Sequence, residues 1–246
     1  MSGPIVVYGG SFDPVHLAHE AMVQAAIEQL QPEKVLIVPC HIPPHKEALK
    51  ASNEDRLAML ELVFKHQPKV VIDTRELETE APSFTVHTVK ALRNEFGPDT
   101  SINFLLGGDS WRNFTSWFEW REILNLVNIL IASRPGEALE SDELKRYQNE
   151  NSARTSALHD SAFGAIARLD FAEQDVASKE IRQALAKRGT IVEEDGAGES
   201  SVEESVAEEN GGANAAQCLN AEVYAYIAKH GLYGAGNKPQ VLERFR

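Results

Sequence analysis

The chain has 246 residues, of which 43% are hydrophobic, and its formal net charge is −13. This length suits a single α/β domain, the lack of any apolar run of roughly 18 residues excludes a membrane-spanning helix, and the acidic balance opposes binding of a nucleic-acid backbone. With no signal-peptide pattern at the N-terminus and only two cysteines, Cys40 and Cys218, we expect a cytoplasmic protein without a disulfide framework.

The first 132 residues alternate apolar runs with amphipathic stretches. In chain order they predict a strand at Ile5–Tyr8, a helix at Leu17–Leu30, a strand at Val35–Val38, a helix at Asn53–His66, a strand at Val70–Ile72, a helix at Phe84–Phe96, and strands at Ile102–Leu106 and Val127–Ala132. Strands that alternate with helices form right-handed βαβ units, whose ligands bind just after the carboxyl ends of the strands. We therefore predict an α/β fold, a Rossmann-like doubly wound parallel sheet with helices on both faces.

Beyond residue 136 the strand signal fades, and we predict a smaller C-terminal helical part with helices at Asp142–Glu150, Glu180–Arg188 and Ala221–His230. Residues 190–216 contain eight acidic residues, no Lys or Arg, and almost no large apolar side chain. A segment of this composition cannot bury enough apolar surface to form a core. We therefore predict one domain, residues 1–246, interrupted by a disordered acidic insertion at 190–216.

The first predicted strand runs into a short segment, Gly9–His19, with the sequence GGSFDPVHLAH. Its two glycines allow a tight turn and a close approach to a ligand, and the N–H groups at the start of the following helix attract anions. His16 and His19 are three residues apart, so on one helical turn they lie on the same face. A zinc site would need a third protein ligand, which the neighbouring sequence does not offer, and the lysine of a P-loop is absent. The segment favours a phosphate site built from backbone amides and imidazoles.

This segment resembles the GxFDPxHxGH signature of the nucleotidyltransferases related to class I aminoacyl-tRNA synthetases, with Ala18 in place of the usual glycine. A second segment, Val176–Arg182, resembles the ISSTxIR motif of the same superfamily and departs from it at Ala177 and Lys179. The resemblance implies that residues of both segments, and an arginine between them, bind ATP. These residues are Gly9, Gly10, Ser11, Phe12, His16, His19, Arg134, Ser178 and Arg182.

Further segments narrow the resemblance to the bacterial nicotinate-nucleotide adenylyltransferases. Val38–Lys46 resembles VPxxxPPHK, Pro82–Thr88 resembles SYTxxT, Gly107–Asp109 with Trp117 resembles GxD…W, Ser133–Gly136 contains RPG, and His230–Tyr233 resembles a terminal HxLY. These segments follow the order in which the family has them.

The same resemblance implies an acceptor site. His45 and Lys46 bring cations into the cleft, Thr85 meets a pyridine carboxylate, Asp109 meets the acceptor ribose, and Trp117 stacks on the pyridine ring. Arg134 lies beside the adenosine. Trp111 and Trp120 match no site of the family, so we expect them in the core.

The implied reaction moves the adenylyl group of ATP to nicotinate mononucleotide, with Mg²⁺ held mainly by the ATP phosphates. His16 serves the transition state, His19 and Lys46 the phosphates, and Arg182 the leaving pyrophosphate. Three alternatives stay open: the acceptor is nicotinamide mononucleotide, it is pantetheine phosphate, or the protein is a non-catalytic nucleotide sensor. We expect small-molecule substrates only, with no nucleic acid and no membrane. The oligomeric state is open, a homo-oligomer included.

Overall fold

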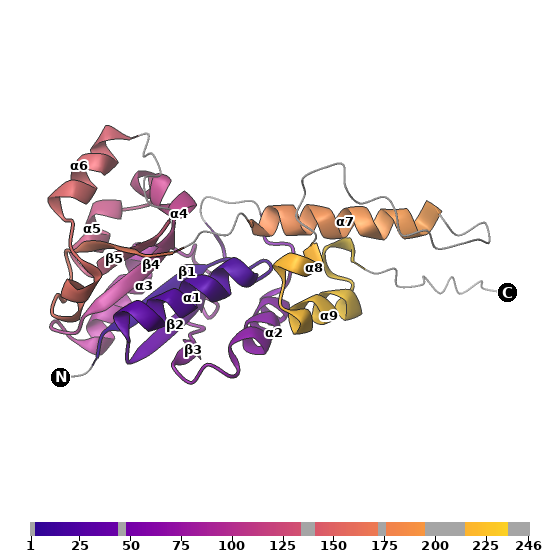
Figure 1. The fold of residues 1–246 in the computed structure, drawn as a ribbon, viewed down its shortest axis with the longest axis horizontal. Coiled ribbons are helices and arrows are strands. Elements are labelled where there is room, and N and C mark those ends of the chain that lie inside the picture. The colour runs from indigo at the N-terminus through magenta and orange to yellow at the C-terminus, as the bar shows by residue number, and fades with distance from the viewer. Residues whose placement is uncertain (1–2, 44–47, 134–140, 172–175, 195–214, 236–246) are drawn as a thin grey trace.

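The computed structural model describes residues 3–43, 48–133, 141–171, 176–194 and 215–235 (Figure 1). Within these ranges one parallel sheet has the strand order β3-β2-β1-β4-β5-β6. The strands are β1 (Ile5–Gly10), β2 (Lys34–Pro39), β3 (Val70–Ile72), β4 (Ile102–Gly107), β5 (Asn128–Ala132) and β6 (Ile166–Leu169). The order reverses between β1 and β4, so the carboxyl ends of these two strands mark the expected ligand site.

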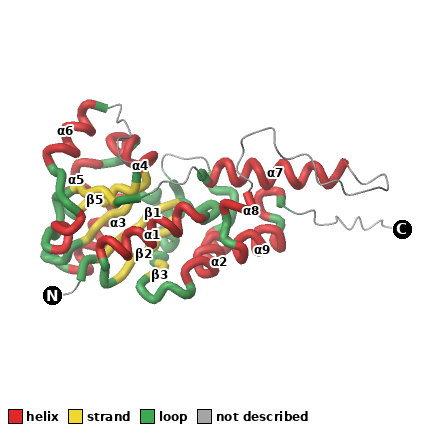
Figure 2. Tube along the Cα trace, in the orientation of Figure 1, coloured by secondary structure: helices red, strands yellow, loops and turns green. Residues whose placement is uncertain are grey.

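Helices cover both faces of the sheet, which lies as the central layer in Figure 2. The core on one face is formed with α1 (Leu17–Leu30) and α2 (Asn53–Phe64), and it continues into α7 (Ser178–Glu194), α8 (Ala215–Cys218) and α9 (Ala221–His230). The other face packs against α3 (Thr85–Phe96), α4 (Gly108–Arg112), α5 (Trp120–Leu124) and α6 (Asp142–Glu150). Successive strand residues point to opposite faces, so in β1 Val6 and Tyr8 enter the first core while Ile5 and Val7 enter the second. The predicted doubly wound fold is confirmed.

The C-terminal helices α7, α8 and α9 lie together at one end of the molecule, with α5 and α6 at the other (Figure 1). Lys65 at the end of α2 forms an ion pair with Glu222 of α9, and the Tyr226 hydroxyl donates to Asp55 of α2 at 3.0 Å. The 3-10 turn Leu232–Gly234 packs on α7 and α9. The C-terminal part of the chain therefore packs against α2, the helix that follows β2. No helix in the described ranges has the length and hydropathy to cross a bilayer.

Two expectations about the second half of the chain were wrong. A sixth strand, β6, pairs with β5 in the register Ile129↔Ile166 to Ala132↔Leu169. This strand has only four residues, one of them Arg168, so it is too short to show the pattern of polar and apolar residues that predicts a strand. Its pairing with β5 makes it a strand. Helix α7 is also longer than predicted: residues 190–194 are helical, although we expected disorder there. The structure has residues 215 and 216 in α8, and 195–214 lie outside the described residues.

Candidate functional site

The predicted phosphate segment, Gly9–His19, begins at the end of β1, where the strand order reverses. Gly9 and Gly10 are the last residues of the strand, so the expected tight turn at the glycines is wrong. Their small size serves packing instead. A Cβ on Gly10 would lie 3.0 Å from the Phe12 ring, and one on Gly9 would lie 3.2 Å from the Phe104 ring. Phe12, with φ of 47°, turns its buried ring back over the strand end.

His16 and His19 meet at the start of α1. His16 is the N-cap residue, and its backbone N–H donates to Nδ1 of His19 at 3.1 Å. The two imidazole rings stack with their centroids 3.7 Å apart. Because Nδ1 of His19 accepts, a neutral His19 carries its proton on Nε2. The predicted pair of imidazoles is thus brought together at a helix N-terminus.

His16 is only 5% exposed, and among the described residues its Nδ1 atom has no hydrogen-bond partner. Burial lowers the pKa of this imidazole to about 4, so it is neutral at pH 7. A buried polar atom without a partner is uncommon in proteins and calls for a contact from a ligand or water. A neutral imidazole donates from one nitrogen, which suits a hydrogen bond to a phosphoryl oxygen.

The sequence analysis missed Arg56, which fixes the loops around this site. Its side chain is fully buried, and its guanidinium donates to the carbonyl of Ser11 at 2.8 Å and to that of Cys40 at 2.7 Å. These carbonyls follow β1 and β2, so one side chain of α2 joins two strand-end loops. The available signal was an arginine placed three and four residues before the buried Met59 and Leu60, on the apolar face of the helix.

The sequence analysis also assigned no role to Asp13, whose carboxylate is almost completely buried. The backbone N–H groups of Lys50 and Ala51 donate to it at 2.8 and 3.1 Å. The Tyr233 hydroxyl donates to it at 2.7 Å. A buried carboxylate in the phosphate segment therefore binds chain from two distant regions.

Ser178 and Arg182 lie at the N-terminus of α7, and both reach the phosphate segment. The Ser178 hydroxyl donates to the carbonyl of Pro14 at 3.1 Å, and the Arg182 guanidinium donates to that of Asp13 at 2.6 Å. The structure thus places two residues of the segment Val176–Arg182 against the phosphate segment, more than 160 positions earlier in the sequence. In this structure they bind backbone carbonyls.

On the acceptor side, the loop after β2 is joined to the segment before α3. The backbone N–H of His41 donates to the Ser83 hydroxyl, and the N–H of Ser83 donates to the carbonyl of Ile42, both at 3.0 Å. Thr85 is the first residue of α3. This helix has no side-chain cap and no acidic residue in its first turn. The positive end of its dipole is thus not neutralised by its own first turn, which favours an anion there.

Trp117 is half-buried at the end of a short 3-10 turn, with its ring edge-on to Phe104 at 6.3 Å between centroids. Its neighbour Phe118 is 46% exposed and packs against Phe84, 4.8 Å away. Phe118 has no counterpart in the sequence predictions. An exposed aromatic ring at the start of α3 gives this site an apolar wall.

Asp109 lies in the first turn of α4, directly after β4, where its exposed carboxylate forms an ion pair with Arg112. Trp111 and Trp120 are 1% and 8% exposed, so their predicted place in the core is confirmed. His45, Lys46 and Arg134 lie outside the described residues.

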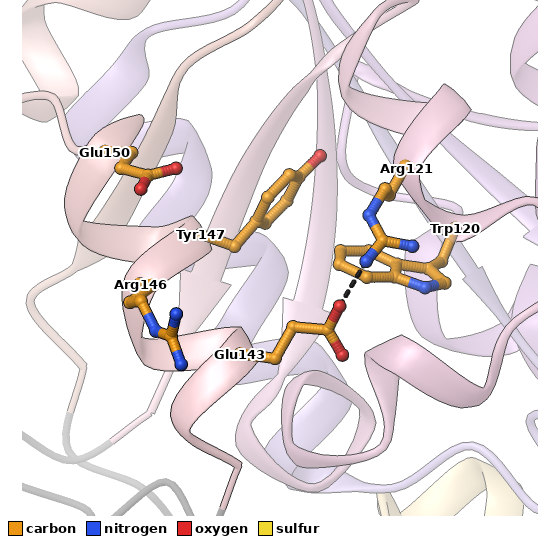
Figure 3. Close-up of a pocket in the computed structure, with 6 residues that line it drawn as sticks. All are labelled: Trp120, Arg121, Glu143, Arg146, Tyr147 and Glu150. Carbon is orange, nitrogen blue, oxygen red and sulfur yellow. Dashed lines mark hydrogen bonds and ion pairs between the residues drawn. The ribbon is translucent and has the colours of Figure 1, made fainter.

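A cavity of about 400 Å³ between α5 and α6 contains none of the predicted site residues (Figure 3). The Arg121 guanidinium lies over the Trp120 ring at 4.3 Å and forms an ion pair with Glu143. Two arginines and two glutamates balance its charge, so it has no preference for a polyphosphate. Its lining residues are Trp120, Arg121, Glu143, Arg146, Tyr147 and Glu150. In the described part of the chain, no three His, Cys, Asp or Glu side chains gather into a metal site.

Comparison with known proteins adds independent findings. The cytidylyltransferase-like family model matches residues 7–184. A probable nicotinate-nucleotide adenylyltransferase from Pseudoalteromonas atlantica is 38% identical over 181 residues, covering 73% of this chain and 82% of that protein. One from Dechloromonas aromatica is 32% identical, covering 76% and 88%. The solved structure of Plasmodium falciparum nicotinic acid mononucleotide adenylyltransferase complexed with NaAD aligns with 94% of this chain and 97% of its own, with a TM-score of 0.62 and 22% identity. That last similarity is one of fold.

Proposed function

Because the chain belongs to the nicotinate-nucleotide adenylyltransferases of the cytidylyltransferase-like family, we propose that it transfers the adenylyl group of ATP to nicotinate mononucleotide. The products are nicotinate adenine dinucleotide and pyrophosphate, and the reaction is a step of NAD biosynthesis. The observation that carries the proposal is the stacked pair of His16 and His19 at the strand-order reversal, with Arg182 held against the same segment.

The chemistry needs little from the protein beyond alignment and charge stabilisation. The acceptor's 5′-phosphate attacks the α-phosphorus of ATP, and the bond to pyrophosphate breaks. A phosphomonoester has a second pKa of about 6, so the phosphate of the acceptor is already largely ionised at neutral pH. A general base is unnecessary. What remains is to hold the two phosphates in line and to stabilise the charge on the phosphoryl oxygens.

We assign these tasks to the residues at the strand ends. His16 donates to the α-phosphoryl oxygens in the transition state, which fits its neutral, buried imidazole and unpartnered nitrogen. His19 and Lys46 bind phosphate oxygens, and Ser178 and Arg182 bind the leaving pyrophosphate. The place of Ser178 and Arg182 against the phosphate segment supports their role. Arg134, outside the described residues, is assigned to the adenosine from the resemblance of its segment to the family's RPG motif.

The acceptor site is assigned to the N-terminus of α3 and the aromatic residues beside it. The pyridine carboxylate is bound at Thr85, where the helix offers N–H groups and no acidic side chain in its first turn. Trp117 stacks on the pyridine ring, Asp109 binds the ribose, and His45 and Lys46 reach the acceptor phosphate.

Mg²⁺ would lower the charge of the ATP phosphates, and we propose that their oxygens and water hold it. The proposed partners are ATP and nicotinate mononucleotide, and the proposed location is the cytoplasm.

The test is a turnover assay on the full chain with ATP and Mg²⁺, in separate arms with nicotinate mononucleotide, nicotinamide mononucleotide and pantetheine phosphate. We expect pyrophosphate and a dinucleotide of the mass of nicotinate adenine dinucleotide in the first arm. ATP binding without turnover in any arm would overturn the proposal in favour of a nucleotide sensor. Turnover only with pantetheine phosphate would assign a different acceptor.

A further inference from the structure

The Asp13 carboxylate, within the phosphate segment, accepts three hydrogen bonds. The carboxylate is 2% exposed. Its hydrogen-bond donors are two backbone N–H groups of the loop just before α2 and the hydroxyl of Tyr233 in the last 3-10 turn. In the part of the chain that the structure describes, a guanidinium nitrogen of Arg182 lies 3.9 Å from the carboxylate. The same nitrogen donates to the Asp13 backbone carbonyl at 2.6 Å. Arg182 thus lies beside the acid without a direct hydrogen bond to its side chain.

Tyr233 supplies the shortest of the three hydrogen bonds to this carboxylate, at 2.7 Å. Its backbone has a φ of 58°, a left-handed conformation that costs free energy in a residue with a side chain. Burial, and then the nearby charge of Asp13, raise the pKa of the Tyr233 hydroxyl, so it stays protonated and donates. A strained residue near the end of the described chain is therefore joined to the phosphate segment by a hydrogen bond.

These donors to Asp13 determine which group the Arg182 guanidinium is free to bind. A buried carboxylate that lacks donors is costly and attracts the nearest cation into a direct pair. Asp13 instead receives two backbone N–H groups and a hydroxyl, so its side chain is satisfied without a direct hydrogen bond from Arg182, which lies 3.9 Å away. Arg182 can then keep its remaining N–H groups for an anionic ligand. Loss of the Tyr233 hydroxyl would leave Oδ1 of Asp13 with one donor fewer and draw Arg182 toward it.

We propose that Asp13 and Tyr233 are positioning residues that keep the Arg182 guanidinium available for the polyphosphate chain. The claim deepens the proposed function and rests on it, because it concerns the residue assigned to the leaving pyrophosphate. It makes the turn Leu232–Gly234 part of the transfer site, although this turn follows the last helix of the described chain.

The chain offers a matched control. Tyr226 donates to Asp55 at 3.0 Å, also joining the C-terminal part to an aspartate of the N-terminal half, but in the contact between α9 and α2. Tyr233→Phe and Tyr226→Phe therefore remove the same atom from the same kind of bond. If both bonds serve only to tether the C-terminal part, the two variants should behave alike.

The experiment compares both variants with the wild type in thermal unfolding, in forward turnover, and in calorimetric binding of pyrophosphate and of a non-hydrolysable ATP analogue. We expect a fall in Tm for both variants, larger for Tyr233→Phe because the Asp13 carboxylate is buried. We expect Tyr233→Phe to weaken pyrophosphate and ATP-analogue binding and to lower kcat, each about tenfold, with the KM for nicotinate mononucleotide unchanged. Tyr226→Phe should stay within about twofold of wild type in each measurement.

Asp13→Asn gives a second, independent variant. Without the carboxylate charge no acidic side chain at position 13 draws Arg182 away from its contact with the backbone carbonyl, so adding Tyr233→Phe to Asp13→Asn should weaken pyrophosphate binding no further. Wild-type binding by Tyr233→Phe, equal losses in the two tyrosine variants, or additive losses in the double variant would each overturn the proposal. The binding arm remains decisive if the wild type proves unable to transfer adenylyl groups, so failure of the positioning claim and failure of the proposed function are distinguishable.

Discussion

The imidazole rings of His16 and His19 stack 3.7 Å apart, and Nδ1 of His19 accepts the backbone N–H of His16. Two protonated rings at this distance would repel each other, and burial already keeps His16 neutral. The pair is therefore suited to donating hydrogen bonds from oriented rings, with His16 deeper in the protein and His19 nearer the surface.

Replacing His16 with Ala should leave the fold intact and lower kcat by roughly 10²–10³-fold, because one preorganised donor to the phosphoryl oxygens is lost. The measurement is steady-state turnover with ATP and nicotinate mononucleotide, beside circular dichroism of the same samples. His66→Ala, at an exposed histidine after α2, is the control and should keep wild-type turnover. Wild-type kcat in the His16 variant would remove this residue from the mechanism.

His16 should also make the protein sensitive to acid. Its pKa is about 4 in the folded protein and about 6.5 in an unfolded chain. Above pH 6.5 both states are neutral at this position; below it the unfolded chain takes up the proton first. The free energy of unfolding should therefore fall as the pH drops from about 6.5 to about 4, by on the order of 3 kcal/mol in total.

The measurement is urea unfolding of wild type and His16→Gln between pH 8 and pH 4. The variant removes the titrating group, so its stability should fall less steeply over the same window. Other titrating groups, such as the half-buried Glu20 and Glu76, whose pKa burial raises, are common to both proteins and cancel in the comparison. Parallel curves would show that His16 is not held neutral by the fold.

Arg56→Met should destabilise the protein by about 2–4 kcal/mol, because the carbonyls of Ser11 and Cys40 lose their charged donor. Urea unfolding at neutral pH measures this. Arg121→Met removes an arginine from an exposed ion pair with Glu143, and should change stability by less than about 1 kcal/mol. Equal, small effects of the two substitutions would contradict the role of Arg56 as the link between strand-end loops.

The features that could be predicted are those encoded locally. Apolar runs separated by amphipathic helices predict the parallel sheet, and the segment Gly9–His19 predicts where an anion binds. Arg56 and Asp13 were missed because their meaning lies in partners far along the chain, up to 220 positions away for Tyr233. Strand β6 was missed for a related reason: four residues have no period of their own, and pairing with β5 makes them a strand.

Gly9 and Gly10 show a second limit of prediction from sequence. Gly9 and Gly10 were assigned to a turn that approaches a ligand, yet they end a strand and make room for the rings of Phe104 and Phe12. A sequence shows that a side chain is absent but not which neighbour occupies the space. The same limit applies to Ser178 and Arg182, whose carbonyl partners in the phosphate segment could not be read from their motif.

Deletion of residues 195–212 should leave folding and most of the activity intact. The segment is acidic and poor in large apolar residues, and shortening a loop changes the closure entropy only slightly. The cut leaves α7 to Glu194 and α8 from Ala215 in place. Thermal unfolding and turnover of the shortened chain check this, and an insoluble product or a loss of kcat above about tenfold would show that the insertion serves the site.

The choice of acceptor tests the central claim most directly. Nicotinate and nicotinamide mononucleotides differ only in a carboxylate or a carboxamide on the pyridine ring. The carboxylate only accepts hydrogen bonds and suits the N-terminus of α3, whereas the amide N–H₂ would face other donors at a cost of about 1–3 kcal/mol. The measurement is kcat/KM for the two acceptors at saturating ATP and Mg²⁺. The account predicts a preference for nicotinate mononucleotide of at least about tenfold, and equal values or a preference for the nicotinamide form would contradict it.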